Sequence, residues 1–433
     1  MYVKKLAFIG LAAASIICRP SYAPSSVLTL STAYTPSSAP PSLSTSPSSS
    51  VSTSSLHSSV STERPYSLDN PSSTYTWPAD SSQSSTNTQP VGTNPVIIEH
   101  TTFLGEQQSS NSCTHRDLGF TGPFGGHWYA VYGDTLYCQG GVSDRVSDPD
   151  EDSEGFHGMV RDALARLTDD PLMIEWTDLN LDSPITHPKQ FVPYNEAWGE
   201  TTSTGFGGTS LCEIDNQTAL LFYLVNQNDA VFPGAGVAKI ELQDGSPIVT
   251  KRFGDNGYWW DVSNTPRYGD VAAYRDVNSD YIYAWGGAPT SVDSYPDNQY
   301  VYQLRVRAEA AFDLSKYEYW WGLSRGWRVG EPLAEFTSET AVMWMVGQGQ
   351  VLYSAYYMTY MYIHFNGGDV AIRTAPSPEG PWSNDVSLFT PQPYPNGMVY
   401  AACTHPYLDE SGKSLTISYT NLNHIQVIQT TFQ

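Results

Sequence analysis

The segment CTHRDLGFTGPFGGHWYAVYGDTLYC spans residues 113–138 and is the most informative part of the chain. Two strand-like runs flank Gly125-Gly126, and a glycine pair is a favoured two-residue loop of a β-hairpin. With this turn, the numbers of any two residues that face each other across the hairpin add up to the same total as the numbers of the two glycines. Cys113 and Cys138 meet this condition, so they are expected to face each other. Directly opposed Cβ atoms lie about 4.5–5.5 Å apart, so this register predicts a disulfide between the two cysteines.

The same register opposes two carboxylates, Asp117 and Asp134, on the face of the hairpin that carries the cysteines. Two carboxyl groups held close together acquire different pKa values, so that one keeps its proton while the other is ionised. Acid/base cleavage of a glycosidic bond requires such a pair. Two alternatives remain open at this point. The aspartates could hold a structural calcium ion, or Pro123 beside the turn could shift the register so that they never meet.

Four later segments repeat the plan of this hairpin, with an apolar run, a turn and a second apolar run. They span residues 209–225, 270–285, 341–357 and 400–419. In the third of these later segments, residues 341–346 are expected to pair with 351–357 across a turn at 347–349. Helical signals are scarce, and the best of them, residues 158–167, is short.

Five hairpins over about 310 residues suit the blades of a propeller, so the sequence predicts an all-β fold, a five-bladed β-propeller. Residues 425–432 and 96–100 are expected to share one blade and to close the ring. A two-sheet sandwich is the alternative architecture.

The first 95 residues are not expected to join this fold. Residues 1–23 carry Lys4 and Lys5, an apolar run and a small-residue ending, which together indicate a secretory signal peptide. Residues 24–95 are rich in Ser, Thr and Pro without apolar periodicity, which predicts a disordered, stalk-like linker. The β-propeller domain is therefore assigned to residues 96–433, and the protein is predicted to be secreted, extracellular or associated with a cell wall.

The chain carries 44 Asp and Glu against 21 Lys and Arg, a net charge of −23 at pH 7. This charge repels phosphate backbones and anionic lipid, so nucleic acid and membrane surfaces are not expected partners. Neutral carbohydrate remains open, and the 29 Tyr and 12 Trp residues suit sugar binding. We expect a monomer that binds a carbohydrate or polysaccharide.

The sequence contains no P-loop, dinucleotide fingerprint or Gly-x-Ser-x-Gly elbow, which argues against kinase, dehydrogenase and esterase functions. It also lacks C-x-x-C and H-E-x-x-H, so no zinc site and no cofactor are predicted. Structural calcium is the alternative, although the acidic run at residues 148–154 is more typical of a solvated loop than of a calcium site. The pairing of Cys212 and Cys403 is left open, and Asn216 begins an N-glycosylation sequon.

Several short motifs resemble those of domain-of-unknown-function family 4185. They are HRDLG (115–119), YGDT (132–135), RTAPSPEGPW (373–382), THP (404–406) and LTISY (415–419). The resemblance covers roughly residues 100–433 and implies a five-bladed propeller. It also implies a secreted glycoside hydrolase acting on arabinan-type polysaccharides, with the acidic residues of the first blade, here Asp117 and Asp134, in the catalytic role.

Three polar residues at the entrances of later blades are predicted to reach the propeller axis as substrate-binding groups: Asp270, Glu339 and His405. Residues at the mouth of a propeller can converge into a carbohydrate pocket, although each could instead cap a strand or pair with an arginine. The leading hypothesis is thus a secreted glycoside hydrolase with Asp117 and Asp134 as its catalytic pair. The alternatives are a lectin-like propeller without turnover and a structural wall protein displayed on the stalk.

Overall fold

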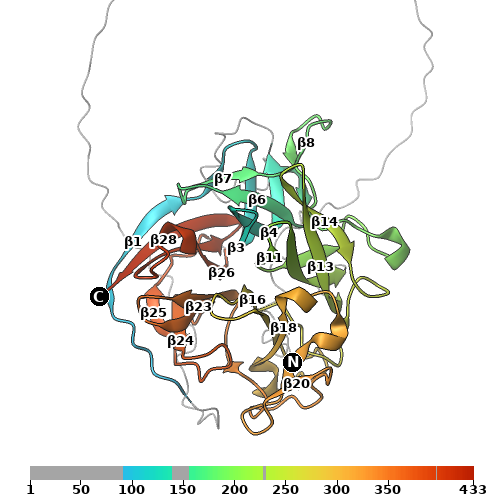
Figure 1. The fold of residues 1–433 in the computed structure, drawn as a ribbon. Coiled ribbons are helices and arrows are strands. Elements are labelled where there is room, and N and C mark those ends of the chain that lie inside the picture. The colour runs from blue at the N-terminus through green and yellow to red at the C-terminus, as the bar shows by residue number, and fades with distance from the viewer. Residues whose placement is uncertain (1–90, 139–155, 228–230, 396) are drawn as a thin grey trace, which may run out of the picture. The chain divides into compact units, whose positions relative to one another are not determined.

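The computed structural model describes residues 91–138, 156–227, 231–395 and 397–433 (Figure 1). The predicted signal peptide, all but the last five residues of the predicted linker, and the acidic run at 148–154 lie outside the described residues. Within the described ranges, no helix is both long and apolar enough to cross a lipid bilayer.

The described residues form five mainly antiparallel sheets around a central axis, together with one separate two-stranded sheet (Figure 1). Each of the five sheets is one blade of a propeller, and the strand that begins the blade lies nearest the axis. The predicted five-bladed β-propeller is therefore confirmed.

Each of the first three blades has six strands or strand segments. Blade 1 contains β3 (Thr114–Phe124), β4 (His127–Cys138), β6 (Ala163–Leu167), β7 (Met173–Trp176) and β2 (Gln108–Ser109), with β5 (Phe156–Val160) beside β4. Blade 2 contains β10 (Gly205–Gly208) and β11 (Cys212–Asp215), β12 (Thr218–Gln227), β13 (Val231–Gln243) and β14 (Ser246–Arg252), with β15 (Trp260–Asp261) beside β13. Blade 3 contains β16 (Ala272–Arg275), β17 (Tyr281–Gly287), β18 (Tyr300–Arg307), β19 (Glu318–Trp320) and β20 (Trp327–Val329), with β21 (Met343–Trp344) beside β18.

The last two blades have four strands each. Blade 4 contains β22 (Gly349–Ser354), β23 (Thr359–Asn366), β24 (Asp369–Ala375) and β25 (Val386–Phe389). Blade 5 contains β26 (Val399–Thr404), β27 (Ser414–Asn421), β28 (His424–Phe432) and β1 (Ile98–Glu106). The separate sheet pairs β8 (Leu179–Asn180) with β9 (His187–Pro188). Short 3-10 turns lie in the connections: η3 (Glu196–Trp198), η4 (Asp297–Gln299), η5 (Ala308–Ala310), η6 (Leu314–Lys316) and η7 (Pro406–Leu408).

The ring is closed by β1, which supplies the outermost strand of the last blade. This strand pairs antiparallel with β28, and the pairing runs from Ile98 opposite Phe432 to Glu106 opposite Gln426. The prediction that the two ends of the folded region share one blade is thus confirmed. Backbone hydrogen bonds between strands far apart in sequence hold the ring shut.

Apolar side chains of neighbouring blades pack against each other around the ring. One cluster joins blade 1 to blade 2 through Val131 and Leu221, and another joins blade 3 to blade 4 through Trp285 and Tyr362. Because successive side chains of a strand point to opposite faces, a strand covered on both faces reads as a continuous apolar run. In β12, seven consecutive side chains are buried in this way.

The best helical signal of the sequence does not form a helix, and one predicted hairpin is wrong. Residues 158–167 form strands of blade 1 and not a helix, because the run is short and its apolar residues pack between neighbouring strands. The hairpin expected between residues 341–346 and 351–357 does not form. Met343 and Trp344 pair with β18 of blade 3, whereas residues 349–354 are the first strand of blade 4 and turn into β23 at residues 355–358.

Candidate active site

The β3–β4 hairpin contains two bulges that cancel each other. The predicted register holds from Phe124 opposite His127 to Phe120 opposite Val131, and it holds again at Arg116 opposite Thr135. Between these stretches, Leu118 faces Tyr132, so each strand carries an additional residue. Bulges of this kind redirect side chains and are frequent beside active sites.

The bulge in β3 depends on an unusual backbone. Leu118 has a φ of 65° and Gly119 a φ of 107°. The left-handed conformation turns the Leu118 N–H out of the ladder, and this N–H donates instead to Oγ1 of Thr420 on β27, at 2.9 Å. Blade 5 therefore compensates the hydrogen bond that the bulge removes from blade 1.

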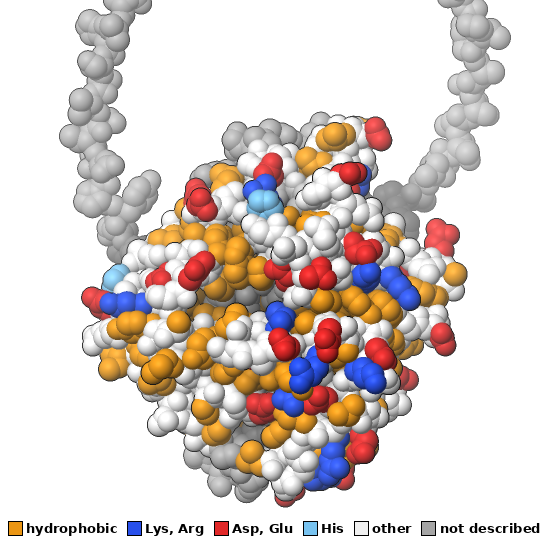
Figure 2. Space-filling view, in the orientation of Figure 1, with side chains coloured by type: hydrophobic (Ala, Val, Ile, Leu, Met, Phe, Trp, Pro, Cys, Tyr) orange, Lys and Arg blue, Asp and Glu red, His pale blue; other side chains and the backbone are white. Residues whose placement is uncertain are grey.

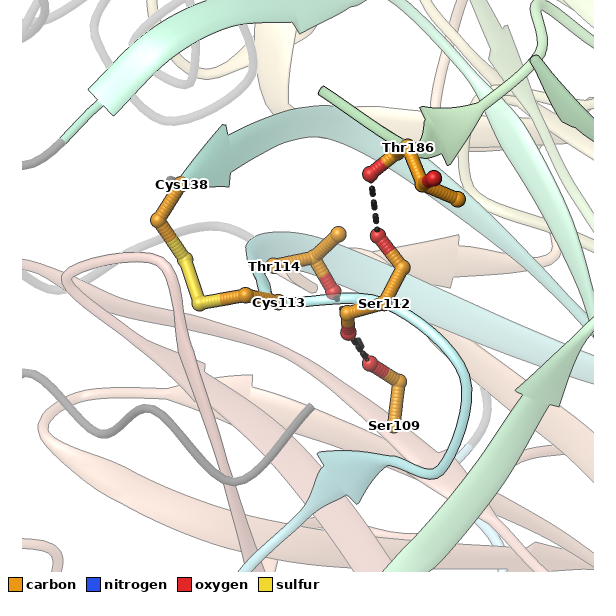
Figure 3. The surroundings of a disulfide bond; sticks show 6 residues. All are labelled: Ser109, Ser112, Cys113, Thr114, Cys138 and Thr186. Carbon is orange, nitrogen blue, oxygen red and sulfur yellow. Dashed lines mark hydrogen bonds between the residues drawn. A yellow bond between two sulfur atoms is a disulfide. The ribbon is translucent and has the colours of Figure 1, made fainter. Parts of the chain in front are cut away.

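The outer end of the hairpin is fixed by the predicted disulfide between Cys113 and Cys138, which the structure confirms (Figure 3). The two Cα atoms lie 5.4 Å apart, and the Cys138 N–H donates to the Cys113 carbonyl oxygen at 3.2 Å. Beside this bond, the Ser112 hydroxyl donates to the Thr186 carbonyl oxygen at 3.0 Å. The entrance to β3 is thus tied to its own partner strand and to a neighbouring loop.

Asp117 is buried within the bulged part of β3. The Tyr400 hydroxyl, on β26 of blade 5, donates to Oδ2 of Asp117 at 2.7 Å. Burial, and then the neighbouring carboxylate of Asp134, raise the pKa of Asp117 well above the ordinary value of an aspartate, although the Tyr400 hydrogen bond opposes this shift. Asp117 is therefore a carboxyl group that keeps its proton at higher pH than usual.

Asp134 lies across the hairpin from Asp117 and is more accessible. Its side chain is 15% exposed, and Nη1 of Arg161 lies 3.5 Å from each of its carboxylate oxygens. Arg161 thus places a positive charge beside this carboxylate. The pair therefore combines one buried, proton-retaining carboxyl group with one accessible carboxylate beside a cation.

The intervening glycine allows the two aspartates to come together. A Cβ atom added at Gly133 would lie 2.3 Å from Oδ1 of Asp117, closer than any real contact. The glycine of the Gly133-Asp134 pair is therefore required by the position of the Asp117 carboxylate.

Both aspartates line one cavity between blades 1, 2 and 3. Its wall is apolar on the side of blade 2, where Phe206, Leu224 and Phe232 contribute. The face drawn in Figure 2 is hollowed near the middle of the ring and carries hydrophobic, acidic and basic side chains around the hollow. A cavity with apolar walls and a few converging polar groups has the character of a small-molecule site.

Asp270 lines the same cavity and is held rigidly. Its Oδ2 accepts a hydrogen bond from Nε of Arg267 at 2.6 Å, and its Oδ1 accepts one from the Gly287 N–H at 2.9 Å. Burial raises the pKa of Asp270, while Arg267 acts against this effect. Gln348 completes this side of the cavity and donates to the backbone carbonyl oxygen of Asp270 at 3.1 Å.

The other two predicted substrate-binding residues do not reach this cavity. Glu339 is exposed, because the segment that follows it joins blade 3 through β21 and does not begin the fourth blade at the axis. His405 is buried, and burial lowers its pKa to about 4, but it lies at the end of β26 outside the lining set. Contrary to the prediction, both residues therefore lie outside the candidate site.

Three polar lining residues escaped sequence reasoning: Arg161, Asn226 and Gln348. None of them lies in a recognisable motif, and Arg161 falls within residues 158–167, the best helical signal in the sequence. The remaining predicted positions lie outside the cavity lining. Asn216 is exposed in the turn between β11 and β12, while Cys212 and Cys403 are free and buried.

Three solved structures illustrate the comparisons with known proteins. A protein of Bacteroides ovatus with a provisional hydrolase assignment is 18% identical, with a TM-score of 0.47 over 74% of this chain and 87% of that chain. A GH43_1 enzyme from Xanthomonas citri complexed with xylotriose is 14% identical, with a TM-score of 0.42 over 76% and 90%. An exo-beta-1,3-galactanase from Phanerochaete chrysosporium is 11% identical, with a TM-score of 0.41 over 76% and 64%.

A search of curated proteins finds no match. The sequence profile of one family matches residues 106–431, from the last residue of β1 to the penultimate residue of β28, and this segment contains all the residues that line the cavity. The chain therefore belongs to the family described as domain of unknown function (DUF4185).

Proposed function

We propose that this protein is a glycoside hydrolase that cleaves a neutral polysaccharide with Asp117 and Asp134 as its acid/base pair. The observation that carries the proposal is the unequal environment of two neighbouring carboxyl groups in one cavity. Burial and Asp134 raise the pKa of Asp117, whereas Asp134 is accessible and lies 3.5 Å from Arg161. Glycosidic bond cleavage needs one protonated and one ionised carboxyl group in this way.

In this mechanism, Asp117 donates its proton to the oxygen of the leaving sugar. Asp134, which lies beside Arg161, acts as the carboxylate that either removes a proton from water or attacks the anomeric carbon. The Tyr400 hydroxyl holds Asp117 in place through its 2.7 Å hydrogen bond. Asp270, fixed by Arg267 and the Gly287 N–H, offers a further acceptor to sugar hydroxyl groups.

A neutral substrate agrees with the charge of the cavity and of the whole chain. Three of the charged lining residues are aspartates and one is an arginine, and the chain carries a net charge of −23. A polyanionic polysaccharide would be repelled by this field. Arabinan-type polysaccharide, which the family resemblance implies, is accordingly the first substrate to test.

The test is incubation of the purified chain with arabinan and with a panel of other neutral polysaccharides, followed by assay for new reducing ends. We expect product from at least one member of the panel and none from polyuronates. Asp280→Asn is a matched control, because the Asp280 side chain is 80% exposed and remote from the cavity lining. Saturable binding without product would refute the hydrolase and identify a lectin-like propeller.

We further propose that the protein is secreted and glycosylated at Asn216. The Cys113–Cys138 disulfide and the exposure of Asn216 support this proposal, since disulfides persist in oxidising compartments. Sequencing of the mature N-terminus in the native host is expected to give residue 24. A mature protein that still begins at residue 1 would contradict the assignment.

A further inference from the structure

Three side chains from distant parts of the chain meet at the corner where the propeller ring closes. They are Glu106 at the end of β1, His115 near the start of β3 and His424 at the start of β28. One nitrogen or oxygen atom from each lies within 4.8 Å of the other two. Among the described residues, this is the one group of three or more metal-ligating side chains with such spacing, and it lies outside the candidate active site.

The geometry within the group is close to that of a ligand set. His424 Nδ1 and Glu106 Oε1 are 2.6 Å apart, and the rings of His115 and His424 meet edge to face with centroids 4.5 Å apart. A tetrahedral zinc ion with ligands at about 2.0–2.2 Å needs neighbouring ligand atoms roughly 3.3 Å apart. Small side-chain movements would open the Glu106–His424 contact and bring His115 to the same distance.

The guanidinium of Arg116, the residue that follows His115, also binds a neighbouring residue of the chain. Nη2 of Arg116 donates to the backbone carbonyl and the side-chain Oε1 of Gln107, each at 3.1 Å. The guanidinium also lies over the Tyr132 ring, 4.9 Å from its centroid. Arg116 therefore directs hydrogen bonds to Gln107, while its charge still acts on Glu106.

We propose that Glu106, His115 and His424 bind a divalent transition metal ion, with zinc as the expected occupant. Two imidazole nitrogens and one carboxylate oxygen form a donor set that suits Zn²⁺ and its neighbours. Ca²⁺ and Mg²⁺ prefer six or more oxygen ligands, which this group does not offer. The side chain of Glu106 is 33% exposed, so an ion can enter from solvent and a water molecule can complete the coordination.

The ion would stabilise the closure of the ring. Glu106 and His424 are 318 residues apart in sequence, and the backbone already joins these segments where the Gln107 N–H donates to the Ile425 carbonyl at 2.7 Å. The Arg116 N–H donates to the Asn423 carbonyl at 2.7 Å and ties blade 1 to the same corner. A metal ion would add a crosslink between β1, β3 and β28, and its binding free energy would add to the stability of the fold.

The experiment uses the tag-free full chain, stripped with a chelator and then titrated with Zn²⁺ by calorimetry. We expect one high-affinity site per chain, a melting temperature several degrees higher with Zn²⁺, and an absorption spectrum of tetrahedral Co²⁺ when cobalt replaces zinc. None of these readouts depends on polysaccharide cleavage, so they test the site independently of the proposed function.

Variants assign the site to its three residues. Glu106→Gln is the first choice, since this half-buried residue can change without loss of the fold, and we expect at least tenfold weaker Zn²⁺ binding. We expect the same weakening of Zn²⁺ binding for His115→Asn, provided that this variant folds. Glu99→Gln is the matched control, because Glu99 is an exposed glutamate on the same strand. Absence of a one-to-one site, or binding that Glu106→Gln leaves unchanged, would overturn the proposal.

Discussion

At the scale of single residues, the proposed chemistry depends on the different surroundings of Asp117 and Asp134. We expect Asp117→Asn and Asp134→Asn each to lower kcat/KM by about 10³-fold, because one acid/base group contributes ~10²–10⁴-fold. Asparagine keeps the shape of the side chain but cannot transfer a proton. Initial rates on the substrate identified by the panel, with Asp280→Asn as control, would measure the effect. Full activity in either variant would exclude that residue from the catalytic pair.

Asp117 also makes the stability of the protein depend on pH. Burial raises its pKa in the folded state, so its contribution is fully present below the pKa of the unfolded chain, near 4, and is lost as the pH rises through the raised value. Asparagine does not titrate. We therefore expect Asp117→Asn to raise the melting temperature by about 1–3 °C at pH 7, with the difference vanishing towards pH 4.

Asp134→Asn provides the comparison for this melting experiment. The Asp134 side chain is partly exposed and lies beside Arg161. Its replacement by asparagine therefore removes an ion pair and relieves a smaller desolvation cost than the replacement of Asp117. We expect no increase in its melting temperature at pH 7. Equal stabilisation by both substitutions would show that simple charge repulsion, and not the burial of Asp117, sets the pH dependence.

Gly133 offers a test that leaves both carboxylates in place. A methyl group at this position would lie 2.3 Å from Oδ1 of Asp117 and 2.9 Å from Cδ1 of Leu118, so Asp117 would have to move. A displacement of about 1 Å can cost about 10²-fold in rate, and we expect Gly133→Ala to lower kcat/KM by this order. Circular dichroism should show an unchanged fold, and wild-type kinetics would mean that the position of Asp117 is unimportant.

The sequence could predict some residues of the cavity and not others. Asp117 and Asp134 are related by hairpin geometry, which the Gly125-Gly126 turn makes visible. The prediction for Glu339 is wrong because its segment crosses between two blades, and nothing in the sequence marks that crossing. Arg161 could not be found, since its place depends on how blade 1 adds outer strands.

At the scale of the hairpin, the predicted register survives two compensating bulges. Pro123, the residue expected to cause a slip, pairs with Trp128 in the predicted register. The two bulges lie instead around Leu118 and Gly133. Because each strand carries one additional residue there, the register is restored beyond them and the sequence shows no net insertion. The disulfide prediction is therefore correct, although the strands between the cysteine pair and the turn are not regular.

We expect loss of the disulfide to destabilise the fold by about 3 kcal/mol, the chain-entropy value for a loop of this length. The loop spans 25 residues and contains both aspartates. The double variant Cys113→Ala/Cys138→Ala should unfold at lower denaturant, and reduction of the wild type should reproduce the shift. Cys403→Ala, which removes a free cysteine, should remain as sensitive to reduction as the wild type. A double variant with wild-type stability would contradict the tethering role.

At the scale of the whole molecule, polar contacts near the axis join blades that are distant in sequence. The Gln350 amide, on β22, donates to Oγ1 of Thr121 at 2.7 Å, and the Thr121 hydroxyl donates to the Thr404 carbonyl at 2.6 Å. Blades 1, 4 and 5 are linked through these three buried residues. Composition and hydrophobic pattern indicate five blades, but they carry no information on such inter-blade bonds, because each bond depends on the assembled ring.

The boundary of the folded unit provides the last prediction. Residues before β1 already contact blade 4, since the Gly92 N–H donates to the Trp382 carbonyl at 3.0 Å and the Thr374 hydroxyl donates to the Thr93 carbonyl at 3.0 Å. We therefore expect a chain that begins at Val91 to melt within about 2 °C of the full chain, because a Ser/Thr/Pro-rich sequence offers few apolar side chains to a core. Its polysaccharide activity should also be unchanged.

A chain that begins at Gln107 lacks β1 and should behave differently. Its β28 would become an open edge with unpaired backbone groups, and Ile428 and Phe432, buried in the intact ring, would lose part of their cover. We expect a lower melting temperature by at least about 10 °C or aggregation, measured by differential scanning fluorimetry and size-exclusion chromatography, because an edge of this kind invites pairing between chains. Equal stability of the two truncated chains would show that the ring closes without β1.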